Sequence, residues 1–192
     1  MTSMLEFDPV AHRYTLDGRE LPSVTQILGR YEDWSAIPPG IREAALARGR
    51  RIHAACALML DGFIGPHDSG DDIAPYLVQF ERFLAESGFV ATLSEERVFS
   101  ERLHYAGTLD MYGYLPKRRL VLIDIKTGSV PRSAGPQTAA YARALKECEG
   151  HETRYRYALL LTPGGYKLVL LDNPNDDQVF LAALTMHNWS TK

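Results

Sequence analysis

Two aspartates, Asp110 and Asp124, are the residues of this sequence best placed to do chemistry. Asp124 belongs to the run Val-Leu-Ile-Asp-Ile-Lys at 121–126, in which apolar residues surround one acid and one lysine. If this run is a β-strand, alternate side chains face opposite sides, so Asp124 and Lys126 project together while the apolar residues beside them face the core. The pattern predicts a buried strand with one chemically active face.

Carboxylates beside a lysine suit the metal-dependent hydrolysis of a phosphodiester. That reaction requires neutralised charge on the phosphate and an activated water, and carboxylates holding Mg²⁺ provide for both. We expect the oxygen ligands to come from Asp110, Asp124 and the backbone carbonyl of Ile125. Lys126 would orient or deprotonate the water, or stabilise the transition state as a cation. Acting as a base requires a lowered pKa, whereas the electrostatic role requires no shift, and both roles stay open.

Other polar residues are predicted to approach the same place. His53 ends the string Gly-Arg-Arg-Ile-His at 49–53, at the edge of the apolar stripe of a predicted helix. Its imidazole can reach a metal held by the sheet, and Gly49 would leave room for that approach. Imidazole suits Mn²⁺ somewhat better than Mg²⁺, so either ion is expected. Glu95 is a candidate ligand or base on the preceding strand, and Glu96 is its rival because neighbouring strand residues face opposite ways.

Substrate contacts are expected from a helix that follows the second aspartate and from the histidine helix. Gln137 and Tyr141 lie four residues apart and share one helix face, among small alanines that would let this helix lie close to the sheet. We expect both to orient the substrate. Arg50 and Arg51, beside the histidine, are candidate contacts to a nucleic-acid backbone.

Taken in order, these residues resemble the PD-(D/E)xK nuclease superfamily, in particular the branch of RecB-type nuclease domains and the mitochondrial genome maintenance exonuclease. The resemblance rests on Pro22 to Thr25, His53, Glu95, a Gly-x-x-Asp turn from Gly107 to Asp110, Asp124-Ile-Lys126, Gln137 and Tyr141. It implies a phage or bacterial member with a restriction-endonuclease-like α/β core, a central mixed sheet flanked by helices. It also implies a Mg²⁺ or Mn²⁺ dependent enzyme that trims DNA ends or single-stranded flaps in replication, recombination or repair, alongside replication or recombination proteins that the sequence does not identify.

Length and composition favour one domain over residues 1–192. The chain is 45% apolar and has no repeat or low-complexity tract. We expect residues 1–38 to form an accessory hairpin and helix, and residues 39–192 the core. The formal net charge of -3 argues against coating duplex DNA by charge alone, so contacts to DNA must be local. The arginines at positions 42, 48, 50 and 51 are candidates, whereas the basic turn at 117–119 is more simply a solvated surface.

The two cysteines, Cys56 and Cys148, are too few for a disulfide framework or a four-thiolate iron-sulfur cluster. Cys56 is better explained as a small buried residue than as a zinc ligand. The sequence contains no apolar run near the roughly 20 residues needed to span a bilayer, and its start does not read as a signal peptide. These features favour a cytoplasmic setting without a membrane partner.

Periodicity and turn residues predict the order of the elements. Strands are expected at 5–7, 13–16, 93–100, 105–114, 120–126, 154–161 and 166–171, with the third to fifth forming an antiparallel meander. Helices are expected at 23–28, 41–60 (after the breaker Pro38-Pro39-Gly40), 74–87, 135–148 and 176–189. Ser23 and Gln26 form a capping box for the first helix, and Gly88 ends the third.

The sequence leaves open three alternatives to an exonuclease. One is an endonuclease on the same fold. Another is a DNA-binding module that has lost cleavage, although the complete charged set argues against it. The third is an unrelated metal phosphohydrolase for small phosphoesters, for which the sequence offers no glycine-rich phosphate loop.

Overall fold

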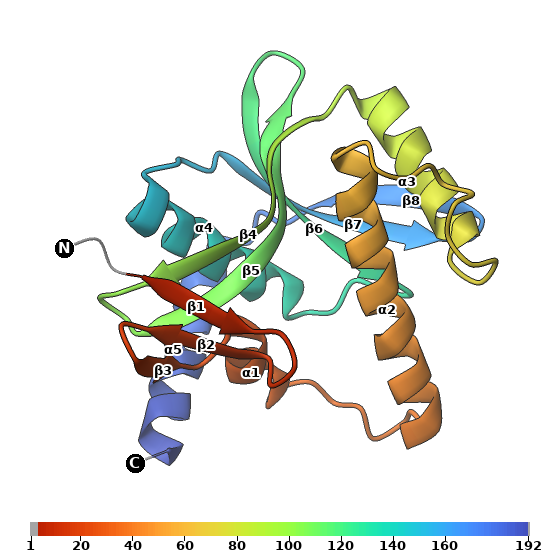
Figure 1. Cartoon of the computed structure of the whole chain (residues 1–192). Coiled ribbons are helices and arrows are strands. Elements are labelled where there is room, and N and C mark those ends of the chain that lie inside the picture. Colours follow the sequence, from red (N-terminus) through yellow and green to blue (C-terminus); the bar gives the residue numbers. More distant parts are fainter. Residues whose placement is uncertain (1–3, 192) are drawn as a thin grey trace.

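The computed structural model describes residues 4–191 and shows a central five-stranded sheet with helices on both faces (Figure 1). The strands are β1 (Leu5–Asp8), β2 (Arg13–Leu16), β3 (Arg19–Leu21), β4 (Val90–Ser100), β5 (Tyr105–Leu115), β6 (Arg119–Thr127), β7 (Tyr155–Thr162) and β8 (Gly165–Leu170). The helices are α1 (Val24–Gly29), α2 (Pro39–Leu60), α3 (Ala74–Ser87), α4 (Ala134–Glu149) and α5 (Asp176–Ser190).

The central sheet has the strand order β4-β5-β6-β7-β8. Its first three strands form the expected antiparallel meander, β6 and β7 are parallel, and β8 returns antiparallel. A parallel pair needs a long connection, and α4 supplies it between β6 and β7. The expected mixed sheet flanked by helices is confirmed.

Each face of the sheet has its own apolar core. Val121, Ile123 and Ile125 of β6 pack with residues of α2 and α3, while Leu122 packs on the other face with residues of α1, α4 and α5. Because both faces are covered, β6 is apolar almost throughout, and the acid at position 124 stands out against it. The alternation expected from the sequence therefore holds in this strand.

The N-terminal region forms a three-stranded antiparallel sheet rather than only a hairpin. The expected pair is present, and β3 adds a strand too short for periodicity to reveal. This sheet is joined to β5, because the Tyr14 hydroxyl lies 2.8 Å from Thr108 Oγ1 and the Ala106 amide donates to the Pro22 carbonyl at 3.1 Å. The capping box of α1 is also confirmed, since Ser23 and Gln26 satisfy each other's backbone amides.

One local expectation is wrong. The segment from Gly107 to Asp110 is not a turn but lies inside β5, where Gly107, Thr108 and Leu109 pair with β4. Gly88 does end α3 in the left-handed conformation, with φ of 64°. Among the helices of residues 4–191, none combines the length and apolar character required of a bilayer-spanning segment.

Candidate metal centre

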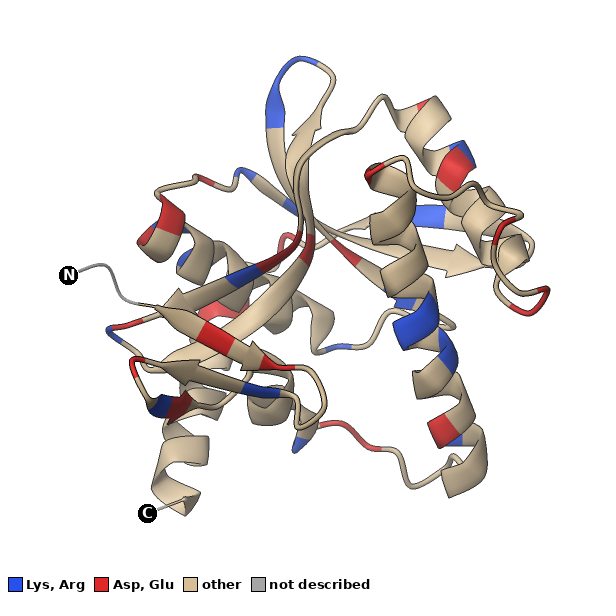
Figure 2. Cartoon of the chain, in the orientation of Figure 1, with Lys and Arg blue, Asp and Glu red and all other residues tan. Residues whose placement is uncertain are grey.

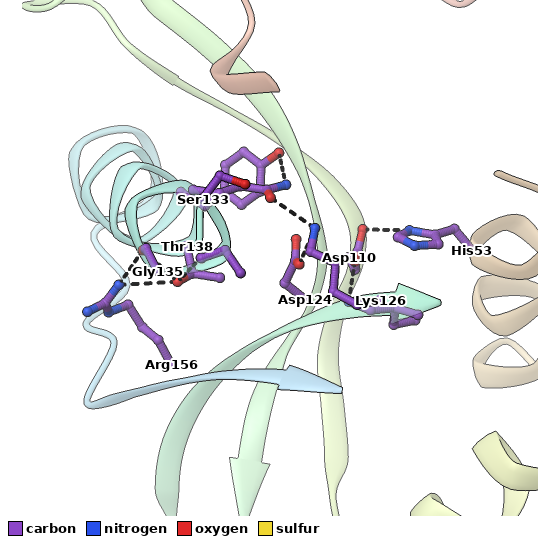
Figure 3. A network of polar contacts seen from close by, with 12 residues as sticks. His53, Asp110, Asp124, Lys126, Ser133, Gly135, Thr138 and Arg156 are labelled. Carbon is purple, nitrogen blue, oxygen red and sulfur yellow. Dashed lines mark hydrogen bonds and ion pairs between the residues drawn. The ribbon is translucent and has the colours of Figure 1, made fainter. Parts of the chain in front are cut away.

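Three metal-ligating side chains from three elements converge above the middle of the sheet. His53 of α2, Glu95 of β4 and Asp110 of β5 each offer a ligand atom within 4.8 Å of the other two. His53 Nδ1 lies 3.1 Å from Asp110 Oδ1, and Figure 3 shows the imidazole reaching across from its helix to the carboxylate on the strand. The structure thus brings together a nitrogen and two carboxylates that are up to 57 positions apart in the chain.

The backbone of β4 is distorted where Glu95 faces Asp110. The residues on either side of Glu95 pair regularly with Met111 and Leu109, yet Glu95 itself has φ of 50° and drops out of the ladder. A left-handed conformation is unfavourable for a glutamate, and such strain clusters at functional sites. In this structure the carboxylate of Glu95, rather than that of Glu96, lies in the cluster with His53 and Asp110.

The two aspartates occupy adjacent strands and are both buried. Asp110 accepts a hydrogen bond from the Ile125 amide through Oδ2 at 2.6 Å, which fixes its orientation. Asp124 is 1% exposed, and its Oδ2 lies 2.7 Å from Lys126 Nζ. The ammonium group of Lys126 therefore already compensates the charge of this buried carboxylate.

A chain of hydrogen bonds runs from Lys126 into α4. Lys126 Nζ donates to Gln137 Oε1 at 2.9 Å, and Gln137 Nε2 donates to the Tyr141 hydroxyl at 3.1 Å. The expected shared face of Gln137 and Tyr141 is therefore seen, and it is turned toward Lys126. Gly107 makes this possible, because a Cβ there would lie 2.5 Å from Tyr141 Cε1.

The protonation of His53 and Glu95 depends on the charge of neighbouring Asp110. Burial disfavours a charged imidazole, but the carboxylate of Asp110 outweighs burial and raises the pKa of His53 to about 9. Burial, followed by repulsion from Asp110, raises the pKa of Glu95 to about 7. The site therefore holds an excess of acidic groups that is relieved by any nearby positive charge.

The pKa values of the buried groups Asp110, Asp124 and Lys126 are likewise set by burial and by neighbouring charges. Burial acts to raise the pKa of Asp110, but His53 and Lys126 outweigh it and lower that pKa. Burial raises the pKa of Asp124 despite the neighbouring ammonium group. For Lys126, burial opposes the charge, while Asp124 and Asp110 favour it and raise the pKa.

The donor set fits a divalent cation. Carboxylate oxygens are the ligands that Mg²⁺ prefers, and one imidazole is compatible with Mn²⁺. The cluster supplies both kinds of donor, and the carboxylate of Asp124, paired with Lys126, lies on the strand next to that of Asp110. The carbonyl of Ile125 stays a predicted ligand.

The basic residues of α2 divide into paired and unpaired groups. Figure 2 shows positive charge on this helix and at the tip of the hairpin between β5 and β6. Arg51 donates two hydrogen bonds to Asp72, at 2.6 and 2.9 Å, and its contact to substrate stays a prediction. Arg50 is exposed. A Cβ at Gly49 would meet Thr127 Oγ1 at an ordinary 3.5 Å, so an alanine there would fit beside His53.

Two contacts around the site had no signal in the sequence. The Ser133 hydroxyl donates to Glu32, which joins the segment after α1 to the start of α4. The Tyr14 hydroxyl contacts Thr108 beside the cluster. Both contacts join residues more than 90 positions apart, and no local periodicity marks them.

Comparison with known proteins gives little to add to this geometry. No family model and no curated protein matches the chain. Among solved structures, the chain is similar to a protein from Eubacterium rectale whose crystal structure is described as that of a "putative exonuclease", with 15% sequence identity and a TM-score of 0.46. The similarity covers 85% of this chain and 69% of the other. A likeness of this degree carries no argument about activity.

Proposed function

We propose that this protein is a divalent-metal-dependent DNA nuclease of the PD-(D/E)xK superfamily, in its RecB-type branch, and that it degrades DNA from ends or single-stranded flaps. The observation that carries the proposal is the convergence of His53, Glu95 and Asp110 beside the buried pair Asp124 and Lys126. Metal-dependent phosphodiester hydrolysis requires ligands for the ion and a positive charge beside the phosphate. The carboxylates and the imidazole can supply the ligands, and the ammonium group of Lys126 can supply the charge.

The residues divide into ligands and positioning groups. His53, Glu95, Asp110 and Asp124 would hold the ion, which when bound supplies Lewis-acid stabilisation for the phosphate and lowers the pKa of a water. Lys126 presents its ammonium group to the phosphate, and Gln137 fixes that group at 2.9 Å. Tyr141 holds Gln137 in turn. Arg50, exposed on α2 three residues before His53, is the proposed backbone contact on the approach to the site.

The activity is tested with end-labelled single-stranded and duplex DNA and with circular single-stranded DNA, each incubated with Mg²⁺, Mn²⁺ or EDTA. We expect linear DNA to be cleaved with either metal and to survive in EDTA. Circular DNA separates the two nuclease classes, since an exonuclease leaves it intact and an endonuclease cuts it. Binding of DNA without cleavage under every metal would instead identify a silent binding module.

Asp124→Asn is expected to abolish metal-dependent cleavage while leaving the fold intact. The substitution keeps the shape of the side chain but removes the charge that the cation and Lys126 both need, and we expect a loss of at least about 100-fold in kcat. Asp68→Asn, on the exposed loop after α2, is the matched control and should keep full activity. Wild-type activity in the Asp124 variant would contradict the site assignment.

A further inference from the structure

The first turn of α4 carries Gln137 and contains Gly135, a poor helix former. The N-cap residue, Ser133, makes no side-chain cap hydrogen bond, because its hydroxyl donates to Glu32. Within the turn, Thr138 Oγ1 lies 2.9 and 3.0 Å from the carbonyl oxygens of Ala134 and Gly135. Further contacts hold this turn from outside the helix.

Those contacts come from behind the helix, on the side away from Lys126. Arg156 of β7 donates through Nη1 to the Gly135 carbonyl at 2.6 Å and to Thr138 Oγ1 at 3.2 Å. Its Nη2 donates to Asp176 Oδ2, at the start of α5, at 3.0 Å. Figure 3 shows the guanidinium meeting the turn from the side opposite to Asp124 and Lys126. One side chain thus joins β7, α4 and α5.

The absent side chain at Gly135 is part of the same arrangement. A Cβ there would lie 2.4 Å from Asp176 Oδ1, so only glycine lets the carboxylate and the helix approach this closely. The ion pair is well shielded from solvent, with 17% of the Arg156 side chain and 7% of the Asp176 side chain exposed. A planar, forked guanidinium can hold a carbonyl and a carboxylate at once, whereas an ammonium group cannot hold both in the same geometry.

We propose that Arg156, together with Asp176, is a positioning residue for the nuclease site, setting the depth of the first turn of α4 so that Gln137 holds Lys126 beside Asp124. Gln137 lies two residues after Gly135, on the turn whose Gly135 carbonyl accepts a hydrogen bond from Arg156. A displacement of that turn moves Gln137 Oε1 away from Lys126 Nζ, and a misplacement of about 1 Å can reduce a rate by about 100-fold. The proposal rests on the nuclease function proposed above.

The test is a double-mutant cycle of Arg156→Lys with Gln137→Ala in the full-length protein. If Arg156 acts through Gln137, Arg156→Lys lowers kcat by about 10-fold in the native background and by less than about twofold when Gln137 is already alanine. KM for DNA stays within about twofold, because the substrate does not touch Arg156. Arg154→Lys, at an exposed residue just before β7, is the control and should change neither constant.

A merely structural role predicts another pattern. In that case Arg156→Lys would reduce kcat by the same factor in both backgrounds, and this result would overturn the proposal. Should Arg156→Lys not fold, Asp176→Asn is carried through the same cycle, because it keeps the shape of the partner and weakens only its charge.

Amide hydrogen exchange tests the positioning without any cleavage assay. The Gln137 amide donates to the Ser133 carbonyl at 2.8 Å, so its exchange reports on the first turn. Arg156→Lys should speed exchange at Gln137 by about 10-fold and leave Leu145, two turns further along α4, unchanged. Unchanged exchange at Gln137 would reject the proposal. If the wild-type protein cleaves no DNA but Arg156→Lys still speeds exchange at Gln137, the nuclease function is rejected and the positioning role of Arg156 is kept.

Discussion

His53 is the residue whose loss should most directly weaken metal binding. It is the nitrogen donor of the cluster and lies 3.1 Å from Asp110. We expect His53→Ala to raise the Kd for Mn²⁺ by at least about 10-fold, equivalent to about 1.4 kcal/mol, and to reduce any preference for Mn²⁺ over Mg²⁺. Titration calorimetry without DNA measures both constants.

His12→Ala is the control for this titration, because His12 lies in the turn after β1 and outside the cluster. An unchanged Mn²⁺ affinity in the His53 variant would remove the histidine from the ligand set. It would leave the three acids as the remaining candidates.

The acids and their neighbours could be predicted because they have local signals. Asp124 and Lys126 interrupt an apolar strand, Gln137 and Tyr141 share a helix face, and His53 lies at the edge of an apolar stripe. Arg156 could not be predicted, since an arginine on a strand has no local mark of function. Its role depends on partners brought by two other elements, and the same is true of the contact between Ser133 and Glu32.

At the scale of elements, the approach of α4 to β5 depends on Gly107. A Cβ at this position would lie 2.5 Å from Tyr141 Cε1 and 3.4 Å from Val24 Cγ2. We expect Gly107→Ala to lower the free energy of unfolding by about 1–3 kcal/mol, because the ring and the helix must shift away from the strand. Urea denaturation measures this loss, and cleavage should fall with it as Gln137 moves from Lys126.

Gly164→Ala is the matched control for crowding. A Cβ at Gly164 meets no atom within 4 Å, and the residue is not in the left-handed region, so its stability should change by less than about 0.5 kcal/mol. Equal stability of the two alanine variants would show that α4 can adjust without cost.

Gly107 also shows why a turn was wrongly predicted at 107–110, inside the strand correctly predicted at 105–114. A glycine followed closely by an aspartate is typical of a turn, yet in a strand interior glycine can instead mark the close approach of another element. What distinguishes a turn from such a strand here is the position of α4, which is set by contacts between residues distant in sequence. Periodicity did predict the long strands and helices, because each buries a continuous apolar face. It did not reveal β3, whose three residues are too few for a pattern.

At the scale of the whole molecule, the accessory N-terminal sheet and the core should unfold together. Pro22 and Tyr14 bond to β5, and Ala106 of β5 packs in the apolar cluster of the N-terminal sheet. We therefore expect one cooperative transition for residues 1–192. Fluorescence of Trp34 and Trp189 and far-ultraviolet circular dichroism should give the same urea midpoint. Separate midpoints would divide the chain near residue 38.

The net charge of -3 bears on how the whole molecule would bind its proposed DNA substrate. A protein with excess acid gains little from general attraction to a polyanion, so its binding must depend on a few local cations. Arg50 is exposed on the helix that carries His53, whereas Arg82 of α3 is paired with Glu86 at 2.7 Å. Arg50→Ala in the Asp124→Asn background should weaken DNA binding several-fold for every sequence. It should also reduce the slope of log K against log salt by about 1.

Arg82→Ala, measured in the same Asp124→Asn background, is the control that separates local from general charge. It removes the same formal charge from the molecule as Arg50→Ala, so a purely global effect predicts equal weakening and an equal change of slope in both variants. If contact at α2 governs binding, fluorescence anisotropy across a salt series will show the loss only for Arg50. Equal losses would mean that the helix beside the cluster has no special part in holding DNA, and the path of the substrate would then have to run over another face.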